Sequence, residues 1–158
     1  MIRPFQPADE DALVDLGNRA WQPIYDMFRQ VCGEQIFALT TPEPDTCKGD
    51  QVRSHCQRAP DWVLVAEEEG RVVGFVTFRL DRDSKIGEIG NNAVDPDCRG
   101  RGIAQQLYTA ALDCFRREGM EAAKVGTGLD WAHAPARRAY ERAGFDRKHE
   151  WVTYFQEL

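Results

Sequence analysis

One segment of the chain, a strand-like run followed by a glycine-rich loop and a helix, constrains the fold more than any other feature. The apolar run from Ile86 to Val94 predicts a strand, and Asp95-Pro96 after it predicts a turn. Arg99-Gly-Arg-Gly102 comes next and precedes a helical pattern that starts at Ile103. Glycine permits a positive φ and a close approach of a ligand to the backbone, and the unpaired N–H groups of a helix start carry a partial charge of roughly +0.5. The segment therefore predicts a phosphate-binding loop, although a turn that needs glycine only for its geometry would look the same.

Residues that are missing from this loop narrow the kind of phosphate ligand. No Gly-Lys-Ser/Thr follows, which excludes a P-loop, and Gln105 stands where a dinucleotide-binding loop has its third glycine. What remains is Arg99-x-x-Gly102-x-Ala104 after a strand that ends in Val94. This pattern resembles the pyrophosphate loop of the GNAT acetyltransferase superfamily, whose members bind acetyl-coenzyme A.

Length and composition indicate one small globular domain over residues 1–158, with 42% apolar and 29% charged residues. No apolar stretch approaches the roughly 20 residues that a membrane span requires, so no membrane partner is expected. The first residues contain no apolar signal core, which favours a cytoplasmic location. The formal net charge of −6 argues against nucleic acid as a partner and mildly favours cationic substrates.

Cysteine and histidine spacing gives no sign of a metal site. The five cysteines form no Cys-x-x-Cys pair, and the three histidines show no ligand spacing with them. We therefore expect reduced thiols and no metal.

Hydrophobic periodicity along the chain predicts a mixed α/β domain. Strands are predicted at residues 2–5, 62–66, 72–80, 86–94 and 122–127, and Val72 to Phe78 is apolar on both alternating faces, as in a strand covered on both sides. Helices are predicted from Pro7 to about Ala20, from Asp45 or Thr46 to Arg58, from 103 to 118, and before Gly144. Pro23 is expected to break the first helix from a second, irregular helical segment that runs towards Val31. The strands at 86–94 and 122–127 pair in parallel if the helix between them is a right-handed crossover.

The stretch from His133 to Phe145 contains a second informative pattern. Its side chains at positions 133, 136, 137 and 140 share one helical face, which by itself predicts an amphipathic helix with a core tyrosine. The GNAT pattern Asn-x-x-Ala-x-x-x-Tyr-x-x-x-Gly-Phe is matched at Ala136, Tyr140, Gly144 and Phe145, with His133 in the place of the asparagine. Together with the loop, this motif identifies the chain as similar to GNAT enzymes over residues 86–145.

The resemblance implies a fold and a coenzyme site. The implied fold is of the α/β (α+β) class, with a mixed, mostly antiparallel sheet and flanking helices. A central pair of strands in this sheet is parallel and splayed, and the last strands of the sheet fall in the run from Trp151 to Phe155. The pantetheine arm of acetyl-CoA would lie in the splayed gap, and its pyrophosphate on the loop. The implied coenzyme-binding residues are Asn92, Ala93, Val94, Arg99, Gly100, Arg101, Gly102, Ile103, Ala104, His133, Ala136 and Arg137.

The resemblance also implies transfer of an acetyl group to a primary amine by direct attack in a ternary complex. Tyr140 aligns with the tyrosine that protonates the leaving thiolate, and the Val94 amide would polarise the thioester carbonyl. Glu88 stands where some members carry a general base, although a glutamate on a half-exposed strand, with water as the base, fits equally well. Candidate acceptor-binding residues are Trp21, Tyr25, Phe28 and Trp131, for which core packing is the alternative.

Two other functions stay open: an acyltransferase that uses another acyl-CoA or a non-amine acceptor, and a non-catalytic coenzyme A-binding sensor on the same fold. The expected partners are acetyl-CoA and an amine acceptor, and a homodimer is left open.

Overall fold

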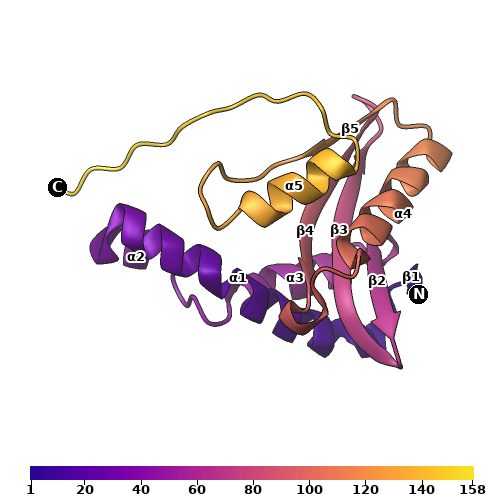
Figure 1. Cartoon of the computed structure of the whole chain (residues 1–158), viewed down its shortest axis with the longest axis horizontal. Coiled ribbons are helices and arrows are strands. Elements are labelled where there is room, and N and C mark those ends of the chain that lie inside the picture. The colour runs from indigo at the N-terminus through magenta and orange to yellow at the C-terminus, as the bar shows by residue number, and fades with distance from the viewer.

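The computed structural model describes residues 1–158 and contains one five-stranded sheet whose strands lie side by side in sequence order. β1 (Ile2–Pro4), β2 (Val63–Glu68), β3 (Arg71–Asp81) and β4 (Ile86–Val94) pair antiparallel, and β5 (Ala122–Val125) pairs parallel with β4. The predicted mixed α/β fold with a mostly antiparallel sheet and one parallel strand pair is confirmed (Figure 1).

Helices cover both faces of this sheet. α1 (Glu10–Cys32) and α3 (Cys47–Arg58) pack against one face, and α2 (Glu34–Thr40) packs against α1. α4 (Ile103–Arg117) packs against the other face, with α5 (Ala134–Arg142) beside it. Short 3₁₀ turns occupy Pro7–Asp9, Pro60–Trp62 and Pro96–Cys98. None of the helices is both long enough and apolar enough to cross a membrane.

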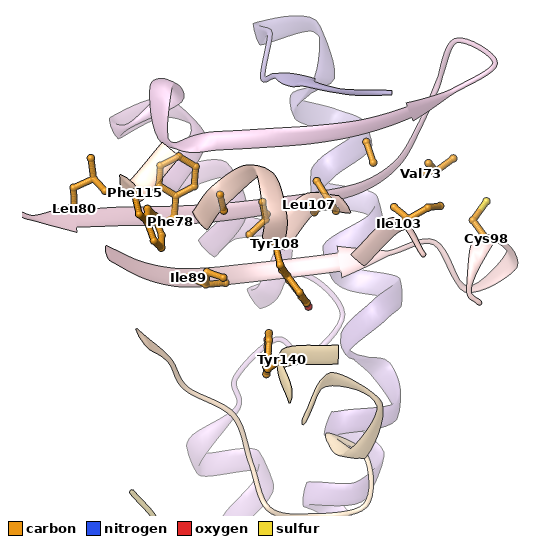
Figure 2. Packing of buried hydrophobic residues seen from close by; sticks show 13 residues of the cluster. Val73, Phe78, Leu80, Ile89, Cys98, Ile103, Leu107, Tyr108, Phe115 and Tyr140 are labelled. Atoms are coloured by element: carbon orange, nitrogen blue, oxygen red, sulfur yellow. The ribbon is translucent and has the colours of Figure 1, made fainter. Parts of the chain in front are cut away.

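The two faces of the sheet form two apolar clusters that share β3. Phe75 packs towards α1 and α3, whereas Phe78 packs towards α4, as predicted for a strand covered on both sides. In the α4 cluster, Phe78 meets Phe115 edge-on with 5.4 Å between ring centroids (Figure 2). These clusters hold β3 and β4 rigidly on both sides, and the candidate site is built on β4.

Pro23 lies inside α1, so the predicted break of the helix was wrong. A proline in a helix removes one backbone hydrogen bond and costs about 3 kcal/mol. α1 buries Leu13 and Leu16 before Pro23, and Tyr25 and Met27 after it. Burial of one such side chain contributes about 1.5–3 kcal/mol, so packing on both sides of the proline outweighs its cost.

The C-terminal run from Trp151 to Phe155 forms no strand, which corrects the expectation of closing strands. The chain after Gly144 has no regular secondary structure, and Figure 1 shows it running from α5 towards the side of the molecule where α2 lies. Phe155 meets Phe28 of α1 there, with 5.9 Å between ring centroids. Because no strand follows β5, the parallel pair lies at the edge of the sheet.

β4 and β5 part halfway along β4. Their pairing ends at Ile89 and Val125, whereas β4 continues to Val94. The same point carries a bulge, because Gly90 and Asn91 together face Thr77 of β3. The Thr77 hydroxyl donates to the Asn91 carbonyl at 3.1 Å, and a Cβ on Gly90 would lie 2.7 Å from that hydroxyl oxygen. Glycine at position 90 therefore permits the bulge that bends β4 away from its neighbour.

Candidate active site

A cavity of about 1100 Å³ opens where β4 and β5 part. Trp21 of α1 and Lys48 of α3 line it from one face of the sheet, and Tyr108 of α4 and Tyr140 of α5 line it from the other. Two molecules that enter from opposite faces would therefore meet beside the second half of β4.

The loop between β4 and α4 presents backbone N–H groups to this cavity. Gly100 and Gly102 have φ values of +79° and +77°, and a Cβ on either would meet nothing within 4 Å. Gly102 precedes the first turn of α4, so the amides of Ile103, Ala104 and Gln105 have no helical partner. All of these residues line the cavity. The segment that the sequence predicted to bind phosphate thus has free amide donors in open space.

The charged residues of this loop have separate roles. Arg19 of α1 donates to the Asp95 carboxylate at 3.2 Å and ties the start of the loop to α1. Arg99 lines the cavity. Arg101 does not line it, since its guanidinium pairs with Glu68 of β2 at 3.3 Å. Of the two loop arginines, only Arg99 is available to a ligand in the cavity.

The backbone of β4 beyond the parting point faces the gap. The Asp95 amide donates to the Val73 carbonyl at 2.8 Å, which makes Gly74 and Val94 a non-hydrogen-bonded pair. The N–H and C=O of Val94, and by the two-residue period those of Asn92, therefore point away from β3 and towards the gap. These groups are free to pair with amides of a bound chain.

Tyr140 ends a chain of hydrogen bonds between α4, β4 and α5. Tyr108 donates from its hydroxyl to Asn92 Oδ1 at 2.7 Å, and Asn92 Nδ2 donates to the Tyr140 hydroxyl at 3.0 Å and to the Gly90 carbonyl at 3.0 Å. Figure 2 shows the Tyr108 side chain pointing from α4 towards α5, where Tyr140 lies. Because Tyr140 accepts from Asn92, its own proton remains free for another group.

Burial keeps the Tyr140 hydroxyl protonated. The side chain is 6% exposed, and burial raises the pKa of Tyr140 above its ordinary value, against the opposite influence of hydrogen bonds with Asn92 and Tyr108. Tyr140 is thus a proton donor at neutral pH.

Glu88 lines the same cavity but is held between two cations. Arg79 of β3 and Lys124 of β5 are its direct cross-strand neighbours, and they lie 2.8 and 3.2 Å from its carboxylate. Both cations contact Oε2, whereas Oε1 has no hydrogen bond or ion pair within the chain.

His133 and Arg137 organise the loop before α5. His133 Nδ1 lies 2.7 Å from the Asp130 carboxylate, and His133 lines the cavity. Arg137 donates to the carbonyls of Gly128 and Asp130 at 2.6 and 2.7 Å and does not line the cavity. Arg137 therefore stabilises the loop, and His133 and Ala136 form the cavity wall. No three His, Cys, Asp or Glu side chains in the chain gather as a metal-binding group.

The four predicted acceptor-binding aromatics divide into two pairs. Trp21 and Trp131 line the cavity. Tyr25 and Phe28 do not line it, since both pack edge-on against Phe37 of α2 with centroid distances of 6.3 and 6.2 Å. Packing between α1 and α2 accounts for the second pair.

Comparison with known proteins agrees with this geometry. The model of the acetyltransferase (GNAT) family matches residues 21–145. The chain belongs to this family. A mycothiol acetyltransferase from Actinosynnema mirum is 29% identical over 160 residues, which cover 97% of this chain and 46% of that protein. The chain spans about half the length of the curated relatives that it matches.

Solved GNAT structures share the fold. The PaiA N-acetyltransferase from Thermoplasma acidophilum in complex with coenzyme A has a TM-score of 0.72 at 14% identity, over 94% of this chain and 90% of that one. A GNAT family acetyltransferase from Brucella melitensis in complex with acetyl-CoA has a TM-score of 0.62 at 24% identity, over 93% of this chain and 82% of that one.

Sequence reasoning missed several residues that line the cavity of this GNAT-family chain. Tyr108 was assigned to no role, although it lies on the same face of α4 as Ala104 and Leu112 and carries a hydroxyl that a buried site must satisfy. Lys48 falls on the stripe of α3 that also carries Val52, a position where a charged side chain is out of pattern. A polar side chain on an apolar stripe was the available signal in both cases.

Proposed function

We propose that the chain transfers an acetyl group from acetyl-CoA to a primary amine by direct attack in a ternary complex. One observation carries the proposal: a single cavity joins a loop of unpaired amides to a buried, protonated tyrosine. The GNAT family membership and the coenzyme A and acetyl-CoA complexes of its structural neighbours support it.

The coenzyme would lie along the gap between β4 and β5. The amides from Gly100 to Ala104, assisted by Arg99, would bind the pyrophosphate. The outward-facing backbone of Asn92 and Val94 would pair with the pantetheine amides, and Ala93, whose backbone groups face β3, would only line the gap. His133 and Ala136 would form the opposite wall. Arg101 and Arg137, which bind groups of the protein itself, are left out of this set.

In the proposed reaction, the amine, the Val94 N–H and the Tyr140 hydroxyl each have one role. The neutral amine nitrogen forms a bond to the thioester carbonyl carbon, and the Val94 N–H polarises the carbonyl oxygen. The carbon–sulfur bond then breaks and Tyr140 gives its proton to the thiolate; the amine nitrogen releases one proton to solvent and Tyr140 regains one from it, so that protons balance. Holding an alkylamine with a pKa of about 10.4 neutral at pH 7 costs about 4.6 kcal/mol, which the site must help to supply.

Glu88 is the acidic residue that lines the cavity, and we propose that the amine proton leaves by way of it. Oε1 has no partner within the chain, so the proton would reach this atom, directly or through an ordered water. The free state of all five cysteines suits a reducing compartment, and we propose a cytoplasmic location.

A thiol-release assay with acetyl-CoA and a panel of amines tests the proposal. Thiol release that depends on an amine, with formation of the N-acetyl product, is the expected result. Faster release from propionyl-CoA would point to another acyl donor. Tight binding of coenzyme A with no turnover on any acceptor would favour a sensor and contradict the enzyme. The relatives named mycothiol acetyltransferase are about twice as long as this chain, so their acceptor is not carried over to it.

A further inference from the structure

Lys48 is a buried ammonium that has no counter-ion. Its side chain is among the buried charged groups of the chain, with a residue exposure of 9%. Nζ donates to Gln51 Oε1 at 2.7 Å and to Asn91 Oδ1 at 3.2 Å, and it lies 4.4 Å from the centroid of the Trp21 ring. All three partners are uncharged, and Lys48 takes part in none of the ion pairs of the chain.

The stability of the fold does not explain why a lysine is buried at position 48. Burial of a charged group without an opposite charge is unfavourable, and burial lowers the pKa of Lys48. Lys48 is also the second residue of α3, where the helix dipole disfavours a cation. Yet its partners are two amide oxygens and an aromatic face, which bind the ammonium form more strongly than the neutral amine. The site is therefore arranged to keep a positive charge facing the cavity.

The rest of the cavity has the same sign of charge. Its lining includes Arg79, Arg99 and Arg142 besides Lys48, and Glu88 is the one acidic residue in it. Glu88 is already paired with two cations, so the cavity has no free negative charge. The net charge of −6 on the whole chain favoured cationic substrates, but the local charge at the site is opposite.

Lys48 lies next to the reacting centre along β4. Asn91, which holds the ammonium, is adjacent to Asn92, which holds Tyr140. Successive side chains of a strand point to opposite faces, so Lys48 and Tyr140 lie on opposite sides of the gap. A group bound at Lys48 would thus approach the thioester from the face opposite to α5. The NH₂ group of Asn91, which lines the cavity, makes no hydrogen bond within the chain and offers a further donor there, whereas Gln51 does not line the cavity.

We propose that Lys48, with the amide group of Asn91, binds a carboxylate of the acceptor, so that the acceptor is a small amine that also carries a carboxylate. One ammonium beside a planar amide matches a planar, singly charged group better than a doubly charged phosphate. The inference rests on the proposed acetyl transfer and names the class of its acceptor.

Matched acceptors test the inference. Initial rates of thiol release are compared for the common amino acids and their carboxamides at equal concentrations of free amine, because loss of the carboxylate also lowers the pKa of the neighbouring amine. The wild type should prefer the best carboxylate over its amide by at least tenfold in kcat/KM. Lys48→Met should remove this preference through a higher KM for the carboxylate, whereas Lys48→Arg should retain most of it. Lys85→Met, at an exposed lysine outside the cavity, is the matched control and should behave as wild type.

A second variant and a binding measurement guard against a folding defect. Asn91→Asp places a carboxylate beside the ammonium and should abolish the preference while Lys48 is intact. Calorimetry with N-acetyl amino acids and their amides on the coenzyme A-bound protein should show the same discrimination without turnover. Equal rates for both acceptor forms, or a preference that survives Lys48→Met and Asn91→Asp, would overturn the inference. So would an acetyl group on Lys48 after incubation with acetyl-CoA, because Lys48 would then itself be the acceptor. Absence of thiol release with every amine would instead contradict the proposed function.

Discussion

Replacement of Tyr140 by phenylalanine isolates its hydroxyl. The ring would keep its packing against Tyr108 and Phe145, at centroid distances of 5.1 and 6.1 Å. Asn92 Nδ2 would keep the Gly90 carbonyl at 3.0 Å as the acceptor of one N–H, and its other N–H, freed from the Tyr140 hydroxyl, would face the open cavity that Asn92 lines. The stability cost is therefore that of one hydrogen bond, about 0.5–1.5 kcal/mol.

The free-energy cost of Tyr140→Phe to catalysis should exceed this cost to folding stability. A positioned general acid contributes about 100- to 10,000-fold, and an alkyl thiolate with a pKa near 8.5 is a good leaving group, so the lower end applies. We expect kcat to fall about 100-fold for Tyr140→Phe, which corresponds to about 2.7 kcal/mol, with little change in coenzyme affinity. The raised pKa of Tyr140 also predicts that the wild type loses no rate through ionisation of this tyrosine below about pH 10.

Single-turnover measurement of acetyl transfer, with product formation followed directly, reports the chemical step. Tyr154→Phe is the matched control, because Tyr154 is 87% exposed in the C-terminal tail. A Tyr140→Phe enzyme within twofold of wild type in the chemical step would refute the argument and leave Tyr140 as a packing residue.

Three further predictions address the loop, the hydrogen-bond chain and the base. Gly102→Glu should abolish the thermal stabilisation by acetyl-CoA, which is worth about 2.7 kcal/mol at 100 times the dissociation constant. Gly119→Glu is the control and should keep this stabilisation, because Gly119 has a similar φ of +74° but lies outside the cavity. Equal melting shifts in both variants would argue against the loop as the phosphate site. Tyr108→Phe should lower kcat about tenfold with unchanged coenzyme affinity, because Asn92 would lose the donor that orients it towards Tyr140. A parallel loss of coenzyme binding would instead mean a general packing defect. Glu88→Gln should lower kcat/KM at neutral pH, and the rate should recover at high pH, where the amine is already free in solution. Glu118→Gln, on the exposed end of α4, serves as the control. An unaltered pH–rate profile would assign proton removal to water alone.

The parts of the fold that depend on neighbours in the chain could be read from the sequence. The strand Ile86–Val94 was predicted at the bounds that the structure shows, and the α4 helix within one residue of its end. Gly100 and Gly102 adopt the positive φ that glycine at these positions was expected to permit. Periodicity and glycine chemistry are local, since they act between residues a few positions apart, and they are therefore visible without a structure.

The continuity of α1 through Pro23 was decided by packing. The local penalty of the proline was judged correctly, but the compensating burial of Tyr25 and Met27 depends on helices that follow later in the chain. The short helix α2 was missed for the same reason, because Phe37 is buried by side chains of α1. Tertiary contacts of this kind routinely outweigh local preference.

The environment of the site residues was likewise decided by the tertiary structure. The sequence indicated Tyr140 and Glu88, yet the register of β3, β4 and β5 sets Arg79 and Lys124 against Glu88, and the bulge at Gly90 directs Asn92 to Tyr140. The sequence by itself determined which residue types and backbone conformations were present at the loop and on α5. Only the folded chain brought residues 43 to 48 positions apart into hydrogen-bond contact, because register and packing arise from the whole sheet and leave no periodic trace in the sequence.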